Sequence, residues 1–176
     1  MAIKEYSFKV SSRAFREVQY FTTFFRHRFQ GAFVAAIFAL AVVLFILNTA
    51  VGVAMSNVMQ MCYIVCLISL QLLMFSCEQR TRKYKESGLD NQMRHVALSE
   101  DWIKLRLIGS PESEKLGWKQ VSSAYELHDR FLLYRGSDNV IFLPKNVMGR
   151  EGELEMREVL IKKLGRGFHS RLGTFR

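Results

Sequence analysis

The stretch that decides the fold runs from residue 31 to residue 77 and reads GAFVAAIFALAVVLFILNTAVGVAMSNVMQMCYIVCLISLQLLMFSC. It contains no Asp, Glu, Lys, Arg or His. A helix that crosses a bilayer needs roughly 20 mostly apolar residues, so this stretch is too long for one crossing. Its middle is interrupted by polar and small residues, namely Asn48, Thr49, Gly52, Ser56 and Asn57. We therefore expect a transmembrane hairpin of two helices, at residues 31–53 and 58–77, joined by a short uncharged turn.

The net charge of +9 is concentrated beside this stretch and at the C-terminal end. Arg26 and Arg28 precede the apolar residues, whereas Arg80, Arg82 and Lys83 follow them. Because basic residues collect on the cytoplasmic side of a membrane, the sequence predicts that both termini lie in the cytoplasm. These five basic side chains are our first candidates for contact with lipid.

The two predicted spans also carry residues suited to helix packing. Gln60 and Gln71 place side-chain amides in an apolar segment, where each amide needs a hydrogen-bond partner. Ala32 and Ala36 have the small-xxx-small spacing that permits close approach of two helices. We expect these four residues to lie at the hairpin contact or at the contact with a second copy. The sequence thus favours a homo-oligomer.

Residues 1–30 are predicted to form a strand and then a helix. Tyr6, Phe8 and Val10 alternate with polar residues, which is typical of a half-buried strand. Ser11 is a candidate N-cap, and apolar residues then recur at helical spacing from Phe15 onward. Arginines surround this apolar face, so we expect an amphipathic helix in the membrane interface. Packing against the C-terminal module is the alternative.

Residues 90–165 have the pattern of a small antiparallel sheet followed by a helix. Candidate strands lie at 94–98, 102–108, 116–126, 131–134 and 140–143, separated by turn residues at intervals of about ten. An amphipathic helix is expected at 151–164, and Gly165 is placed to end it. Strands capped by one C-terminal helix outline a pleckstrin-homology-like (PH-like) module. The predicted fold class is therefore membrane α+β.

Short motifs in this module carry a resemblance to a known family. They are GWKQV at 117–121, FLLY at 131–134 and IFLPK at 141–145. Together with the order of the parts, they resemble the YcxB-like family of small bacterial membrane proteins. The resemblance implies a bacterial inner-membrane location and an N-terminal strand that pairs with an edge of the C-terminal sheet. The family has no established activity, so it supplies no catalytic residues, and Trp118 and Pro144 are interpreted as fold residues.

No pattern in the sequence indicates catalysis or a cofactor. The four histidines are scattered, and none is spaced with a second ligand as a metal pair would be. Gly165, Arg166 and Gly167 lack the further glycine and the strand and helix of a phosphate loop. Acidic pairs occur at expected turns and helix starts, where capping explains them. We expect no enzyme activity, no catalytic residue, no metal and no cofactor.

The segment at 166–176 combines basic and apolar side chains. Arg166 and Arg171 alternate with Phe168, Leu172 and Phe175, a pattern that suits an anionic membrane surface. A solvated, disordered tail is the alternative, and nucleic acid fits less well because the chain is expected to be tethered to a bilayer already. Arg166 and Arg171 therefore join the candidate lipid contacts.

The sequence favours a non-enzymatic binding protein at the inner membrane. Its PH-like module would bind a protein partner, either a toxin or a scaffold, or anionic lipid. Two other classes remain open. One is an immunity protein that neutralises a toxin at the membrane, and the other is a membrane effector that acts by oligomerising.

Overall fold

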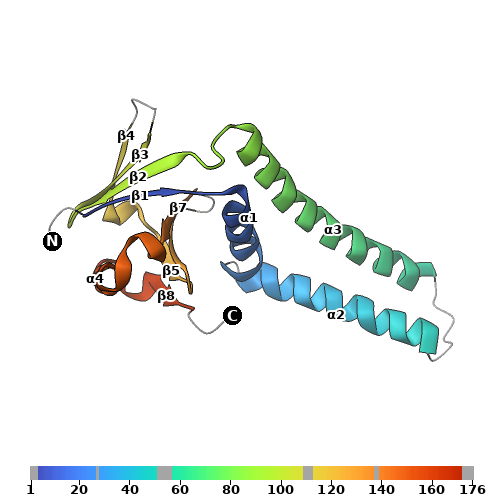
Figure 1. Ribbon diagram of the computed structural model, residues 1–176. Coiled ribbons are helices and arrows are strands. Elements are labelled where there is room, and N and C mark those ends of the chain that lie inside the picture. The colour runs from blue at the N-terminus through green and yellow to red at the C-terminus, as the bar shows by residue number, and fades with distance from the viewer. Residues whose placement is uncertain (1–3, 27, 51–56, 109–112, 137–138, 172–176) are drawn as a thin grey trace. The chain divides into compact units, whose positions relative to one another are not determined.

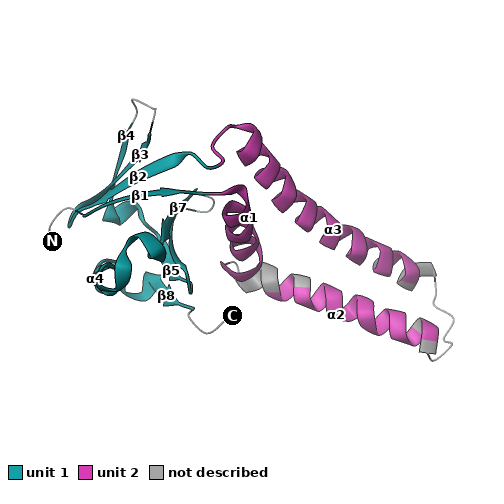
Figure 2. Ribbon diagram, in the orientation of Figure 1, with its two compact units in different colours: residues 1–10, 91–176 teal, residues 11–90 magenta. Residues whose placement is uncertain are grey.

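The computed structural model describes residues 4–26, 28–50, 57–108, 113–136 and 139–171 (Figure 1). The chain divides into two compact units (Figure 2). Unit 1 comprises residues 1–10 and 91–176, and unit 2 comprises residues 11–90. The fold is α+β, with two β-sheets in unit 1 and long helices in unit 2.

The first sheet of unit 1 is antiparallel and contains the N-terminal strand. Its strands are β1 (Lys4–Lys9), β2 (Met93–Leu98), β3 (Trp102–Leu107) and β4 (Ser113–Gly117), in that spatial order. β1 pairs with β2 so that Tyr6 lies opposite Val96 and Phe8 lies opposite Arg94. The N-terminal strand therefore forms an edge of this sheet, as the family resemblance implies. Asn91 N–H donates to the Val10 carbonyl at 3.1 Å, which holds the two ends of the unit-2 insertion together.

The second sheet is mixed. Its strands are β5 (Ser123–Glu126), β6 (Arg130–Arg135), β7 (Asn139–Pro144) and β8 (Phe168–Ser170), in the order β7-β6-β5-β8. β8 runs parallel to β5, whereas the other pairs are antiparallel. A 3₁₀ turn (Lys145–Val147) and helix α4 (Gly149–Leu164) connect β7 to β8. Gly165 ends α4 with a φ of 50° and donates its N–H to the Ile161 carbonyl, as predicted.

The core of unit 1 lies between its sheets and α4. Four successive residues of β6, from Phe131 to Tyr134, are fully buried, so both faces of this strand are covered. β1 contributes Phe8, whose ring lies 6.3 Å from that of Phe142 on β7. Met156 and Leu160 form the buried face of α4.

Unit 2 is helical. It contains α1 (Ser12–Phe21), a π-helical turn (Thr22–Arg26), α2 (Arg28–Ala50) and α3 (Asn57–Glu86). The predicted cap is present, because Ser11 Oγ accepts from Ala14 N–H at 3.2 Å. α1 packs against α3, and the ring of Phe15 stacks on that of Tyr84 at 4.1 Å. The predicted amphipathic helix thus has an apolar partner within its own unit.

The prediction of a transmembrane hairpin at 31–53 and 58–77 is corrected by the structure. Within the described ranges, no helix is both long enough and apolar enough to cross a membrane. α2 begins at the charged residue Arg28, while α3 contains Gln60 and Gln71 and continues to the charged residue Glu86. The predicted transmembrane helices, and with them the predicted membrane α+β fold class, are therefore wrong, and the described fold is α+β. Residues 51–56, which include the end of the first predicted span and part of the predicted turn, lie outside the described residues.

The predicted single strand at 116–126 is also wrong. β4 ends at Gly117, a 3₁₀ turn follows at Trp118–Gln120, and β5 begins at Ser123 in the other sheet. Trp118 is buried and its indole N–H donates to the Ser99 carbonyl at 3.0 Å. This anchored side chain fixes the point at which the chain leaves one sheet for the other.

Candidate functional site

The main unexplained feature of unit 2 is the apolar surface of α2 and α3. We call the exposed large apolar residues of these helices the apolar sleeve. On α2 they are Phe33, Phe38, Leu40, Val42, Val43, Phe45 and Ile46. On α3 they are Met61, Ile64, Val65, Leu67, Ile68, Leu72, Met74 and Phe75. Several of these side chains are more than half exposed, with Phe33 at 66% and Met61 at 69%. Most of the exposed large apolar residues described in this chain belong to the sleeve.

The sleeve surrounds each helix except along the seam where the two helices pack. Ala41 and Leu44 are buried on α2, and half-buried residues on α3 recur every three or four positions at Tyr63, Cys66 and Leu70. This spacing is that of antiparallel helices packed side by side. At 100° per residue, the exposed positions of α2 cover roughly two-thirds of its circumference. The apolar surface is therefore a sleeve and not a single face.

Basic residues collect at one end of this helix pair. Arg26 lies just before α2, and Arg80, Arg82 and Lys83 lie in the last turns of α3, which runs antiparallel to α2. Arg28 begins α2, although its side chain is not described. Arg82 pairs with Glu86 at 2.7 Å, and Arg80 and Lys83 are exposed. By their positions along α2 and α3, the five flanking basic residues that the sequence singled out lie at the same end of the helix pair, and we call them the basic collar.

The four predicted packing residues do not lie at the seam. Gln60 and Gln71 are exposed on α3, and Ala32 and Ala36 are exposed on α2. They are therefore not buried in the hairpin contact. Their role in a contact with a second copy stays a prediction.

The two candidate residues of the C-terminal segment belong to unit 1. Arg166 is exposed in a 3₁₀ turn, and Arg171 donates its backbone N–H to the Glu126 carbonyl at 2.8 Å. Between them, Phe168–Ser170 forms strand β8. A disordered tail is thus wrong for these residues, while residues 172–176 lie outside the described part of the chain.

Unit 1 contains a buried ionic cluster that sequence analysis missed. Glu126, at the end of β5, is fully buried and lies 2.8 Å from Lys145 Nζ and 3.0 Å from Arg157 Nε. Glu153 completes the cluster, with its Oε1 at 2.8 Å from Lys145 Nζ and 3.3 Å from Arg157 Nη2. The sequence signal was Glu126 itself, a charged residue after the apolar run Ala124–Tyr125. Its partners come from distant positions that only the fold brings together.

This cluster alters the ionisation of its central carboxylate. Burial alone would raise the pKa of Glu126, but hydrogen bonds from Arg157 and Lys145 outweigh it and hold the pKa below its ordinary value. Arg157 responds in the opposite direction, because its hydrogen bond to Glu126 raises the pKa of the guanidinium. Two cations and two carboxylates compensate one another, so the cluster has the character of a structural ion network and not of a reactive site.

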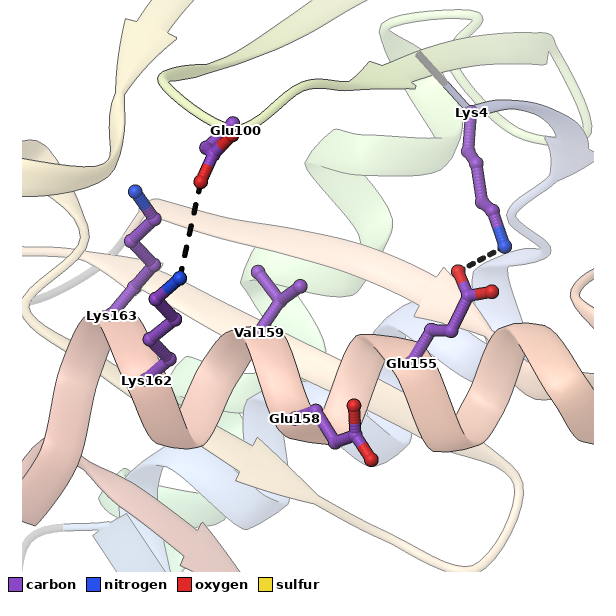
Figure 3. A pocket seen from close by; sticks show the side chains of 7 residues that line it. All are labelled: Lys4, Glu100, Glu155, Glu158, Val159, Lys162 and Lys163. Atoms are coloured by element: carbon purple, nitrogen blue, oxygen red, sulfur yellow. Dashed lines mark hydrogen bonds and ion pairs between the residues drawn. The ribbon is translucent and has the colours of Figure 1, made fainter. Parts of the chain in front are cut away.

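A groove of about 420 Å³ runs along α4 in the same unit (Figure 3). Lys4 of β1 reaches Glu155 across one end, and Lys162 lies 4.0 Å from Glu100 at the other. The remaining lining residues are Glu158, Val159 and Lys163. Its charges are mixed and paired across the opening, so the groove offers no concentrated charge to a ligand.

Among the residues that the structure describes, no group of three or more His, Cys, Asp or Glu side chains is arranged to hold a metal ion. No protein family, curated protein or solved structure matches this chain in the comparisons. The resemblance to the YcxB-like family thus stays an expectation from the short motifs.

Proposed function

We propose that this protein is a non-enzymatic, lipid-associated binding protein, in which the apolar sleeve contacts lipid acyl chains and the basic collar contacts anionic headgroups. The location we propose is the cytoplasmic face of a bacterial inner membrane, where anionic lipids attract basic segments. The observation that carries this proposal is the apolar surface that extends around both helices. The proposal concerns lipid contact and does not require a helix that crosses the bilayer.

The distribution of the sleeve supports lipid over a single protein partner. A helix that is apolar nearly all round is stable only where apolar groups surround it. One docked protein covers one face of a helix pair and would leave the opposite side exposed to water. Acyl chains adapt to any contour and contact Phe38 and Val43 in the same way, although these side chains point in different directions on α2.

The basic collar supports the same interpretation on electrostatic grounds. The apolar segment carries no charge, whereas arginines and lysines gather at one end of the pair. Each basic group near an anionic membrane surface contributes about 1 kcal/mol to binding. Along the helix pair, an apolar region is followed by a basic region. A membrane leaflet has the same order, because its acyl chains are followed by its headgroups.

The test is co-flotation of the full chain with vesicles in a density gradient. We expect the wild-type protein to float with phosphatidylcholine vesicles that contain phosphatidylglycerol. The variant Val43→Asp/Phe45→Glu should remain in the dense fractions, because charged side chains at these positions would have to enter the acyl region. Both side chains are at least half exposed, at 52% and 55%, so the substitutions should leave the helix pair folded.

A matched control comes from α4. Leu154 and Ile161 are also about half exposed, at 50% and 52%, but they lie in unit 1. Leu154→Asp/Ile161→Glu should float as the wild type does. The lipid proposal is wrong if the sleeve variant floats as the control does. It is also wrong if the wild-type protein does not float with vesicles and instead forms a defined oligomer in buffer.

A further inference from the structure

The outer face of the first sheet carries a second concentration of positive charge. Cross-strand partners point to the same side of a sheet, so the strand register gives the layout of this face. One row contains Glu5, Ala97, Lys104 and Lys115, from β1 to β4. The next row contains Ser7, His95, Arg106 and Ser113. The charge is graded, because the acidic residue lies on β1 and the cations lie on β3 and β4.

A recess of about 460 Å³ lies on this face. It is lined by Glu5, His95, Ala97, Lys104, Arg106 and Ile108. Ala97 is buried although it belongs to the outer row, because the longer side chains around it rise above its methyl group. His95 Nε2 lies 3.6 Å from Glu5 Oε2 on the β1 side, which leaves Lys104 and Arg106 to define the β3 side.

The cations on β3 are not explained by the fold. Lys104 and Arg106 are exposed, and neither forms an ion pair with another residue in the described part of the chain. Lys104 also faces Lys115 directly across the β3–β4 pair, and like charges in this position disfavour the sheet. Lys115 Nζ is accommodated over the Trp102 ring at 4.9 Å. An anionic partner would relieve this repulsion.

We propose that this face binds an acidic segment of a protein partner in extended conformation, running along β3. Same-side residues of an extended chain repeat about every 6.6–6.8 Å, which is also the spacing of Lys104 and Arg106 on their strand. Carboxylates at alternate positions of the segment therefore meet one cation each. Lys115 lies opposite Lys104 and would flank the carboxylate that binds Lys104. Ile108, which also lines the recess, would contact an apolar residue of the bound segment.

The composition of the face favours a peptide over nucleic acid. Single-stranded nucleic acid needs open aromatic rings on which bases stack. Trp102 is the one aromatic side chain in the two described strands that supply these cations, and Lys115 already lies over its ring. Glu5 at the β1 edge would also repel a phosphate backbone that covered the whole sheet.

The experiment measures fluorescence anisotropy of a labelled peptide with Glu at alternate positions, mixed with the full chain in a mild nonionic detergent. We expect binding that weakens with added salt. Lys104→Glu/Arg106→Glu should reduce the affinity at least tenfold. Lys119→Glu/Lys163→Glu makes the same change of net charge at exposed lysines of unit 1 outside the recess, and it should bind as the wild type does. Lys104→Gln/Arg106→Gln serves as the milder pair if the charge reversal impairs folding.

A second peptide with the same composition but with its glutamates contiguous tests the spacing. It should bind more weakly than the alternating peptide. Equal affinity of the two peptides, equal loss in both charge-reversal variants, or tighter binding of a single-stranded oligonucleotide would each overturn the proposal. This proposal is independent of lipid binding, because the flotation test involves other residues in the other unit.

Discussion

Glu126 is the residue whose environment differs most from what its chemistry prefers. It is fully buried, and its carboxylate is held by Lys145 and Arg157 from two different elements. Lys145 is nearly buried as well and lies 4.9 Å from the Phe131 ring. Removing one member of such a cluster leaves a buried charge without its partner, which costs more than the intact network contributes.

The first prediction concerns the stability of this cluster. Glu126→Gln should lower the free energy of unfolding by about 3 kcal/mol, because Lys145 and Arg157 then share only Glu153 and one buried positive charge is left uncompensated. Chemical denaturation followed by circular dichroism would measure the change. Glu158→Gln, at an exposed position of α4, should change stability by less than about 0.5 kcal/mol. Similar losses in both variants would contradict the role of the buried cluster.

The second prediction concerns pH. The pKa of Glu126 is lower in the folded protein than its ordinary value of 4.5, so the unfolded chain binds the proton more readily. The carboxylate therefore contributes its full stabilisation above pH 4.5. This contribution is lost as the pH falls below 4.5 and through the lower folded-state pKa. Glu126→Gln should show a smaller drop in melting temperature over that range, and an unchanged acid profile would refute this assignment.

At the scale of elements, β1 is the part whose position matters most for unit 1. The whole of unit 2, residues 11–90, separates it from its partner strand in sequence, yet it completes the edge of the first sheet and buries Phe8. Six residues cannot form a stable strand alone, and an unpaired edge of β2 would be exposed. Gly152 of α4 confirms the close approach, since a Cβ there would lie 3.2 Å from the Tyr6 hydroxyl oxygen.

The third prediction follows from this pairing. Deletion of residues 1–10 should destabilise unit 1 and lower its melting temperature, because β2 loses its neighbour and the core loses Phe8. Phe8→Ala alone should cost about 3 kcal/mol, the usual loss for a buried phenylalanine. Ser7→Ala, on the outer side of the same strand, is the control and should have little effect. A melting transition unmoved by the deletion would show that β1 adds no stability.

At the scale of the whole molecule, unit 2 is an insertion within unit 1. The chain leaves unit 1 after Val10 and returns at Asn91, and a hydrogen bond of 3.1 Å joins these two residues. Within unit 2, Asp90 in turn accepts from the Ser12 N–H at 2.6 Å. Both ends of the insertion are therefore close together. Under this condition an inserted domain can be replaced by a short linker without distorting the domain that contains it.

The fourth prediction tests this arrangement. Replacement of residues 11–90 by a flexible linker of about four glycine and serine residues should leave unit 1 folded, with a β-rich circular dichroism spectrum and one cooperative melting transition. The shortened chain should lose co-flotation with vesicles, because the apolar sleeve is gone. Failure to melt cooperatively would mean that unit 1 needs unit 2, and retained flotation would contradict the role of the sleeve.

The sequence predicted the local elements well. Alternation and turn residues located β2, β3, β6 and β7, and the N-cap at Ser11 and the stop at Gly165 were both correct. It failed at Trp118, where an apolar, strand-like pattern continues through a change of sheet. The sequence also did not reveal the ionic cluster. Lys145 and Arg157 have neighbours in sequence that are typical of exposed residues, and only the fold brings them into contact with Glu126.

What the sequence by itself determined is the composition of each part, namely an uncharged apolar segment, basic flanks and a β-rich remainder with a final helix. These follow from hydropathy, charge and period, which are properties of neighbouring residues. Tertiary structure alone decided that the strands divide into two sheets and that four charged side chains meet around the buried carboxylate of Glu126. Those outcomes depend on contacts between residues far apart in the chain, which no local pattern encodes.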